Sequence, residues 1–429
     1  MKALLSPIII LAVSLALTSS TSSSILPRET KNKIWDIANF KSLITFGDSY
    51  TDESRLGWFI NHNGSAPPTG TLLPESLSAA GGGRTWPRYV IQYTGATKKG
   101  AWNPRITLYD YAVSGAVCSN DITPRFVQSV PLFSLWKTNY LNSHVERWFP
   151  AINAPFPSVL EYEVPAFLAD MHAQRVNSTP PTPLYSPALT AKSAVYALWI
   201  GTNDLGIWGF LTASQIRGKT LSDYTSCIYN VFDKLYASGG RAFVLMNTAP
   251  LHLAPLYAND TLHGVGPNQY WPNKTSNQTQ IAETMHEYTT SVNQVFKYQT
   301  PFELLVAKRY PGAHFAIFDT YSLISDIYDS PGKYLNGTGV KNGSESVWGY
   351  ENHCSSDGEM CTKQDNGTNP DAFLWFDELH PRYVFAENLL LFSFPLLAYS
   401  PVEEHLGTNP LWIIVSKPTV SSQGISLTF

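Results

Sequence analysis

The chain has 429 residues, of which 44% are hydrophobic, 13% aromatic and only 14% charged. This apolar content is enough for a large folded core and excludes an intrinsically disordered protein. The formal net charge is −4 and the basic residues are scattered, so nothing indicates a nucleic-acid partner or an anionic membrane.

The first residues have the pattern of an export signal. Lys2 supplies a positive charge, an almost uncharged apolar run extends from Leu4 to Leu17, and small residues follow around Ser19 to Ser24. A membrane anchor is the alternative, but the run is shorter than the roughly 20 residues that a spanning helix needs. We expect a signal peptide over residues 1–22 and a secreted, extracellular protein without stable membrane association.

Short, β-rich apolar runs recur along the rest of the chain and predict five strands. These runs are Ser42–Phe46, Thr107–Tyr111, Val195–Ile200, Ala242–Met246 and His314–Phe318. Helical patterns fall between and after them. Strands that alternate with helices predict a parallel sheet covered on both faces.

The clearest helical pattern is Ser222–Ser238, with apolar residues at the i, i+3/i+4 and i+7 spacing. Ser222 is the expected N-cap, and Gly239 with Gly240 the expected stop. A further helix runs from about residue 280 towards residue 310 and is interrupted by Pro301.

A last helix is expected from Pro381 to Phe394. Pro381 suits the first turn of a helix, and Pro395 would end it.

Two stretches, residues 121–189 and 254–279, are rich in Pro, Asn and aromatic residues and predict long loop insertions. Both leave from just beyond the carboxyl ends of strands, the side on which open α/β sheets bind ligands. The chemical motifs described below extend from Gly47 to Pro381 and must converge on one site. We therefore predict a single domain over residues 23–429.

Eight N-x-[ST] sequons are present, and in an exported chain they predict a glycosylated surface. The acceptor residues are Asn63, Asn177, Asn259, Asn273, Asn277, Asn336, Asn342 and Asn366.

Four cysteines allow three disulfide connectivities. Cys354 and Cys361 lie close together in a polar loop, so we pair them, which leaves Cys118 with Cys227. The alternative is that Cys227 is a buried free thiol, because it falls on the apolar face of the Ser222–Ser238 helix. None of the four has the CxxC spacing of a zinc site, and no metal is expected.

The first strand ends in Gly47-Asp48-Ser49. A serine on the tight turn after a parallel strand is held at the carboxyl edge of the sheet, and its hydroxyl becomes a nucleophile when a neighbouring base takes its proton. On its own, this tripeptide is more often a polar turn that caps the next helix.

A second motif, Asp377-Glu-Leu-His380-Pro381, places a carboxylate three residues before a histidine. This spacing lets Asp377 fold back onto one ring nitrogen of His380 while the other nitrogen faces the serine. The carboxylate then fixes the tautomer and stabilises the imidazolium that forms.

Two more motifs follow buried strands. Gly201-Thr-Asn203-Asp204 places an amide side chain where it can face a developing oxyanion, although Asn203 is also a common turn residue. Ser114-Gly115 supplies a glycine whose backbone N–H can approach a ligand closely.

Together these four blocks, in this order, resemble the signature of the GDSL/SGNH hydrolase superfamily. Within it, the chain is most similar to the secreted fungal acetylesterases classed as carbohydrate esterase family sixteen. The resemblance implies an α/β fold, the three-layer α/β/α flavodoxin-like SGNH fold, with a central five-stranded parallel sheet and long insertions. One departure is Asp110, which stands where many relatives have Asn, and we expect it to alter hydrogen bonding in the loop rather than catalysis.

Carried over by position, the resemblance implies a catalytic triad of Ser49 as nucleophile, His380 as base and Asp377 as its orienter. It also implies an oxyanion hole formed by the backbone N–H groups of Ser49 and Gly115 and the side chain of Asn203.

The expected activity is ester hydrolysis through an acyl-enzyme, on short acyl and chiefly acetyl esters of carbohydrates such as acetylated xylo-oligosaccharides. Aromatic residues of the insertions either stack on sugar faces or pack their own loops; they are Trp136, Trp148, Trp208, Tyr270 and Trp271. The alternatives are a lipase or phospholipase acting on lipid acyl esters, and a carbohydrate-binding protein without catalysis. We expect a monomer with a small-molecule or oligosaccharide ester substrate and no cofactor.

Overall fold

The computed structural model describes residues 35, 39–95, 105–125, 148–149, 154–274, 277–335, 346–356, 360–363, 372–382 and 412–415. The residues of the expected signal peptide lie outside this set. The helices are α1 (Arg55–Asn61), α2 (Trp86–Gly95), α4 (Val164–Asp170), α5 (Thr202–Leu205), α6 (Leu221–Ala237), α7 (Gln278–Pro301), α8 (Thr320–Asp329) and α9 (Pro331–Tyr334). The strands are β1 (Ser42–Gly47), β2 (Thr107–Asp110), β3 (Trp148–Phe149), β4 (Ala154–Pro155), β5 (Ala194–Trp199), β6 (Ala242–Met246), β7 (His314–Phe318), β8 (Ser346–Tyr350), β9 (Asn352–Cys354), β10 (Cys361–Lys363), β11 (Phe373–Trp375) and β12 (Trp412–Val415).

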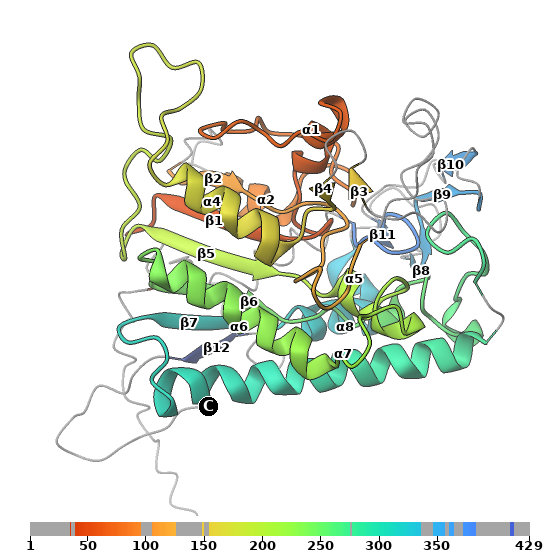
Figure 1. Cartoon of the computed structure of the whole chain (residues 1–429). Coiled ribbons are helices and arrows are strands. Elements are labelled where there is room, and N and C mark those ends of the chain that lie inside the picture. The colour runs from red at the N-terminus through yellow and green to blue at the C-terminus, as the bar shows by residue number, and fades with distance from the viewer. Residues whose placement is uncertain are drawn as a thin grey trace, which may run out of the picture.

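The central sheet has the strand order β12-β7-β6-β5-β1-β2 (Figure 1). Strands β7, β6, β5, β1 and β2 are parallel and coincide with the five predicted runs, so the predicted parallel sheet is confirmed. The sequence analysis missed β12, which pairs antiparallel with β7 and adds a sixth strand at the edge. Strand β1 lies between β5 and β2, so its carboxyl end is flanked by the ends of both neighbours.

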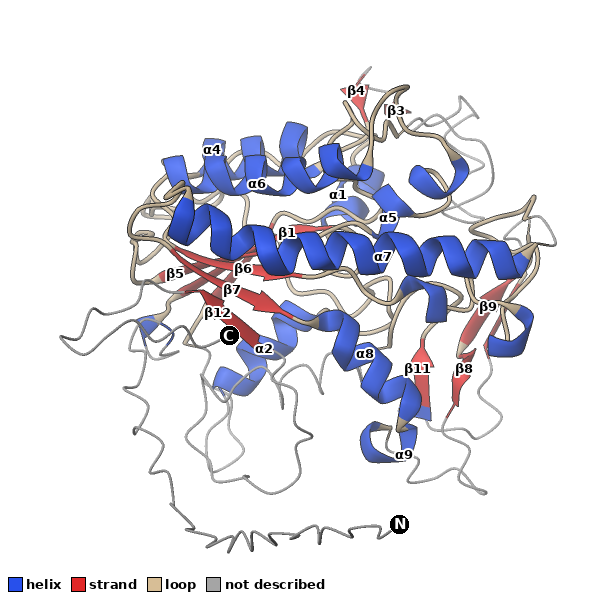
Figure 2. Ribbon diagram, turned by 90° about the horizontal axis from the view of Figure 1, so that it is seen from below, coloured by secondary structure: helices blue, strands red, loops and turns tan. Residues whose placement is uncertain are grey.

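Helices cover both faces of this sheet (Figure 2). Helices α4, α6 and α7 lie on one face, and α2 and α8 lie on the other. This is the three-layer α/β/α arrangement expected from the resemblance. It explains why all six residues of β1 are buried, since a strand covered on both faces has no solvent side.

Helix α6 begins at Leu221, and its N-cap lies two residues earlier than predicted. Its N-cap is Thr220, not Ser222, because Asp223 accepts hydrogen bonds from both the backbone N–H and the hydroxyl of Thr220, each at 2.9 Å. Thr220 and Asp223 thus form a capping box at the N-terminus of the helix. Ser222 lies inside the first turn and cannot serve as the N-cap. The helix ends as predicted before Gly239, whose φ of +105° suits the left-handed residue after a helix.

Helix α7 ends at Pro301, and a π-helical turn over Phe302–Val306 continues from it. The helix predicted to begin at Pro381 does not begin there. Pro381 instead forms an antiparallel bridge with Trp375, and the N–H of Arg382 donates to the carbonyl of Leu374 at 2.8 Å. The chain reverses direction at this point, which extended residues allow and a helix does not. The rest of that predicted helix lies outside the described residues.

Part of the predicted 121–189 insertion contributes to the scaffold. It contains helix α4, whose Phe167 is fully buried against the sheet. The Phe167 ring makes edge contacts with Phe46, Tyr111 and Tyr196, with ring centroids 5.7–5.8 Å apart. This aromatic cluster packs against one face of the sheet at β1 and so helps to fix the strand that ends in the Gly-Asp-Ser motif.

Two disulfides are present, with the pairing favoured from the sequence. Cys118–Cys227 joins the segment after β2 to helix α6, and Cys354–Cys361 links β9 to β10. Cys227 is therefore not a free thiol. In the part of the chain that the structure describes, no helix has the length and hydropathy to cross a bilayer.

Candidate active site

The end of β1 places Ser49 at the carboxyl edge of the sheet. Gly47 has a φ of +148°, and a Cβ there would lie 2.1 Å from the backbone oxygen of Trp199, so only glycine fits. The next residues form a tight turn in which the carbonyl of Asp48 accepts the N–H groups of Thr51 and Asp52, both at 2.9 Å. The turn directs the Ser49 side chain out of the strand.

Ser49, His380 and Asp377 form one continuous chain of hydrogen bonds. Nε2 of His380 lies 2.8 Å from Oγ of Ser49, and Nδ1 lies 2.9 Å and 3.0 Å from the two carboxylate oxygens of Asp377. All three side chains are buried, with 9% or less of each residue exposed. The predicted triad residues are thus brought together in the order nucleophile, base, carboxylate.

The three-residue spacing of Asp377 and His380 has a local explanation. Oδ1 of Asp377 accepts the backbone N–H groups of Leu379 at 2.9 Å and His380 at 2.7 Å, so the carboxylate closes its own turn. The carbonyl of Leu379 accepts the hydroxyl of Tyr50 at 2.9 Å, which ties this turn to the segment that carries Ser49.

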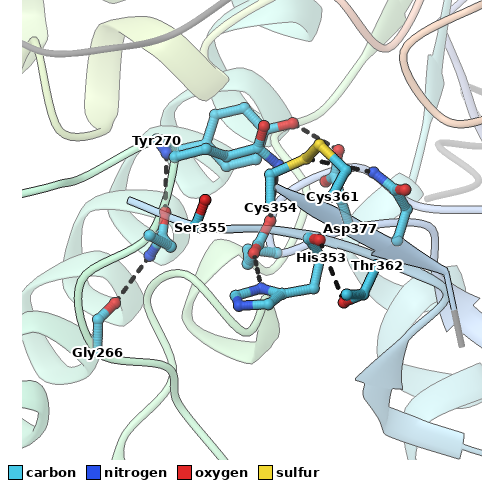
Figure 3. A network of polar contacts seen from close by, with 12 residues as sticks. Gly266, Tyr270, His353, Cys354, Ser355, Cys361, Thr362 and Asp377 are labelled. Carbon is cyan, nitrogen blue, oxygen red and sulfur yellow. Dashed lines mark hydrogen bonds and ion pairs between the residues drawn. A yellow bond between two sulfur atoms is a disulfide. The ribbon is translucent and has the colours of Figure 1, made fainter. Parts of the chain in front are cut away.

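Tyr270 also reaches the triad, and the sequence analysis did not foresee this. Its hydroxyl donates to Oδ2 of Asp377 at 2.5 Å and lies 3.2 Å from Nδ1 of His380 (Figure 3). Tyr270 belongs to the 254–279 stretch and lies 107 residues before Asp377. No motif links the two, so the sequence carried no signal for this contact.

The residues expected to form an oxyanion hole follow the two strands that flank β1. After β2, Gly115 has a φ of +90° in a turn closed by the N–H of Ala116 and the carbonyl of Val113 at 2.8 Å. After β5, the side-chain amide of Asn203 donates to the carbonyl of Ala116 at 2.9 Å. Asn203 therefore stabilises the turn that contains Gly115, which is the structural role considered for it from the sequence. The side-chain amide has two N–H groups, so one remains that can donate to a ligand.

Asp204 adds hydrogen bonds between the segment that follows β5 and the segment that follows β2. Its carboxylate accepts the N–H of Cys118 at 3.0 Å and the hydroxyl of Thr123 at 2.9 Å. Gly201, which precedes these residues, has a φ of +131°, and a Cβ there would lie 2.3 Å from the hydroxyl oxygen of Tyr224. The Gly201–Asp204 segment is thus fixed on both sides.

Asp110 has the loop-bonding contacts that we expected of it. It accepts the hydroxyl of Thr45 at 2.8 Å and the N–H of Glu53 at 2.8 Å. Burial, followed by the charge of Asp52, raises the pKa of Asp110 to about 8.

A small pocket adjoins Ser49 and His380 and has a volume of about 30 Å³. One wall is the loop of Ala79 and Gly81, which packs on the segment after His380. A Cβ on Gly81 would lie 2.6 Å from the carbonyl oxygen of Pro381. The other residues that line the pocket are Tyr50, Arg84, Thr85, Trp86, Trp199, Pro381 and Arg382.

Two opposing effects set the pKa of His380. Burial lowers it, but the charge and hydrogen bond of Asp377, with smaller contributions from the charges of Asp48 and Glu378, outweigh burial and raise the pKa above its ordinary value of 6.5. Asp48 itself is 1% exposed, and burial raises its pKa to about 6. The folded site therefore favours the imidazolium form of His380 more than water does for a free histidine.

The aromatic residues considered for sugar stacking do not form an exposed platform in the described part of the chain. Trp208 and Trp271 are half-buried and pack against the core, and Tyr270 is buried and faces Asp377. Trp136 lies outside the described residues, as does the side chain of Trp148. For the three described side chains, packing within their own loops is the better reading.

The described sequons lie at the surface. Asn63, Asn177, Asn273 and Asn277 are exposed, and Asn259 is half-buried. Asn336, Asn342 and Asn366 lie outside the described residues. Within those residues, no group of three or more His, Cys, Asp or Glu side chains is arranged to hold a metal ion.

Comparison with known proteins gives one family. A family model described as GDSL-like Lipase/Acylhydrolase matches residues 43–384. An acetylesterase from Hypocrea jecorina is 42% identical over 349 residues, which cover 81% of this chain and 86% of that protein. An acetylesterase from Thermothelomyces thermophilus is 26% identical over 217 residues, 50% of this chain and 55% of that protein. A solved structure of an acetylxylan esterase from Geobacillus stearothermophilus has 13% sequence identity and a TM-score of 0.33. The alignment covers 84% of this chain and 97% of the esterase chain.

Proposed function

Because the chain belongs to the GDSL-like lipase/acylhydrolase family and is a carboxylic ester hydrolase, we propose that it is a secreted acetylesterase acting on acetylated carbohydrates. The observation that carries the proposal is the unbroken hydrogen-bond chain from Ser49 through His380 to Asp377. The 42% identity to a fungal acetylesterase supports the acetyl group as the acyl part.

The proposed reaction is a two-step acyl transfer. His380 accepts the Ser49 proton at Nε2 while Oγ attacks the ester carbonyl, and Asp377 stabilises the imidazolium through Nδ1. The backbone N–H groups of Ser49 and Gly115 and the second amide N–H of Asn203 donate to the tetrahedral oxyanion. His380 then protonates the departing alcohol, and water attacks the acyl-enzyme by the reverse sequence of proton transfers.

The pocket beside Ser49 is small. Its volume is about 30 Å³, where one water molecule needs about 10–15 Å³, and this size is compatible with a short acyl group such as acetyl. Gly81 forms part of its wall, and a Cβ there would lie 2.6 Å from the carbonyl oxygen of Pro381.

The proposal also includes export and a sugar as the alcohol part of the ester. The apolar first residues, the two disulfides and the surface sequons all fit an extracellular protein. The acetylxylan and acetyl-sugar chemistry rests on the resemblance to carbohydrate acetylesterases. We therefore name acetylated xylo-oligosaccharides as the first natural substrates to test.

We expect kcat/KM to peak at acetyl or propionyl esters in a p-nitrophenyl ester series and to fall by about 10-fold or more by butyryl. The reason is that the proposed acetylesterase function calls for an acyl site that accepts acetyl or propionyl and is too small for longer chains. Background hydrolysis is subtracted with the Ser49→Ala variant. A rise in kcat/KM from acetyl towards octanoyl would reveal a long apolar groove and replace the acetylesterase proposal with a lipase.

We expect the acid limb of the kcat/KM profile to have its midpoint above pH 6.5. His380 must be neutral to act as the base, and its pKa is raised, so activity is lost as the pH falls through that raised value. The measurement is kcat/KM for p-nitrophenyl acetate from pH 4 to 9 at constant ionic strength. A profile that stays flat down to about pH 4 would exclude a histidine base.

A further inference from the structure

The carboxylate of Asp377 has no unused acceptor position. A carboxylate offers about four lone-pair positions. Oδ1 accepts the N–H groups of Leu379 and His380, and Oδ2 accepts Nδ1–H of His380 at 2.9 Å and the hydroxyl of Tyr270 at 2.5 Å. Among the described residues, Tyr270 therefore supplies the donor to Asp377 that comes from outside the Asp377–His380 turn.

The segment around Tyr270 is itself fixed. Oδ1 of Asn268 accepts the backbone N–H groups of Tyr270 at 2.9 Å and Trp271 at 3.1 Å, and its Nδ2 donates to the carbonyl of Gly266 at 2.9 Å (Figure 3). Nε2 of Gln269 donates to Oε2 of Glu378 at 3.2 Å. These contacts hold the tyrosine against the turn that carries Asp377, so the hydroxyl does not depend on solvent for its position.

Tyr270 remains a donor across the working pH range. It is 7% exposed, and burial, followed by the charge of Asp377, raises its pKa well above the ordinary value of 10. The phenol proton therefore stays on Tyr270 and points at Oδ2 of Asp377.

We propose that Tyr270 is a positioning residue for the reaction, which holds the Asp377 carboxylate toward His380 and withdraws part of its charge. The inference rests on the proposed function, because it assigns a role within the same triad. It also gives the 254–279 stretch a role in the chemistry, in place of the sugar stacking considered for it from the sequence.

The hydrogen bond has a consequence for the basicity of His380. Within the described residues, the titratable groups around His380 include Asp377, Asp48, Glu378, Tyr50 and Tyr270, and Arg84 and Arg382 line the pocket beside it. A donor on Asp377 reduces the attraction of that carboxylate for the imidazolium proton. Loss of the donor therefore raises the pKa of His380 and moves the acid limb of kcat/KM to higher pH, while the less firmly held carboxylate lowers kcat.

The test is Tyr270→Phe, with p-nitrophenyl acetate as substrate and kcat expressed per active site from burst titration. We expect kcat to fall about 10-fold with KM changed less than about twofold, and the acid limb to move to higher pH. The matched control is Tyr229→Phe. Tyr229 is also buried, and its hydroxyl bonds that of Thr300 at 2.9 Å between helices α6 and α7. The Tyr229→Phe variant should therefore leave kcat and the acid limb unchanged.

A second variant keeps the packing intact. Site-specific 3-fluorotyrosine at position 270 retains the hydroxyl but makes it a stronger donor, so the acid limb should move to lower pH, opposite to Tyr270→Phe. Wild-type kcat and an unmoved acid limb in both variants would overturn the positioning role. Ser49→Ala, measured in the same assay, tells the two possible failures apart. If the Tyr270 variants show no effect while Ser49→Ala loses its activity, only the positioning role has failed. If Ser49→Ala keeps its activity, the proposed function itself has failed.

Discussion

Ser49→Ala should lower kcat for p-nitrophenyl acetate by about 10⁴-fold or more, with the melting temperature changed by only a few degrees. The Oγ atom is the group proposed to form the bond to the acyl carbon, and no other hydroxyl in the described residues occupies its place 2.8 Å from Nε2 of His380. The residual rate should remain above that of water, because the proposed oxyanion donors and the pocket are untouched.

The control for this variant is Ser42→Ala. Ser42 is also buried, 2% exposed, but lies at the opposite end of the same strand β1. It should retain wild-type kcat, so a loss confined to Ser49→Ala separates chemistry from damage to the strand. A Ser49→Ala enzyme with wild-type turnover, checked by mass spectrometry for the substitution, would show that another residue is the nucleophile.

Asn203→Ala should lower kcat by roughly 10²–10³-fold and change KM little. The reason is that the proposed hydrogen bond from the Asn203 side-chain amide to the substrate oxygen strengthens only as charge develops in the transition state. The structure adds a second expectation. Because the same amide donates to the carbonyl of Ala116, the melting temperature should fall as well.

Asn293→Ala distinguishes these two effects. The Asn293 side chain makes two hydrogen bonds at 2.8 Å to the backbone of Thr248, in which it both donates and accepts. This variant should lose stability while its kcat per folded molecule stays normal. If Asn203→Ala behaves the same way, Asn203 only shapes the loop and does not belong to the oxyanion hole.

The five parallel strands of the sheet, but not β12, could be predicted from the sequence because they are short apolar runs that are largely buried. The three-residue spacing of Asp377 and His380 was equally informative, since one backbone turn brings them together. Both cases depend on local sequence, where residue type and spacing determine the geometry directly.

Other features depended on distant contacts and could not be predicted in this way. Tyr270 meets Asp377 only because the 254–279 stretch folds back over the carboxyl edge of the sheet. The helix expected at Pro381 was a reasonable reading of proline preference, but pairing with Trp375 determines the backbone there. In both places the structure is determined by contacts with other segments, which local sequence preferences do not encode: the Tyr270–Asp377 hydrogen bond and the β-bridge between Trp375 and Pro381.

The distance in sequence between Ser49 and His380 has a consequence for biosynthesis. The two residues are 331 positions apart, so the nucleophile leaves the ribosome long before its base. At synthesis rates of about 5–20 residues per second, the interval is roughly 15–65 s. During that interval the nascent chain lacks His380, whose Nε2 faces Oγ of Ser49 in the folded protein. Ester hydrolysis through the proposed triad therefore begins only after the Asp377–His380 turn has been synthesised and has docked against the end of β1.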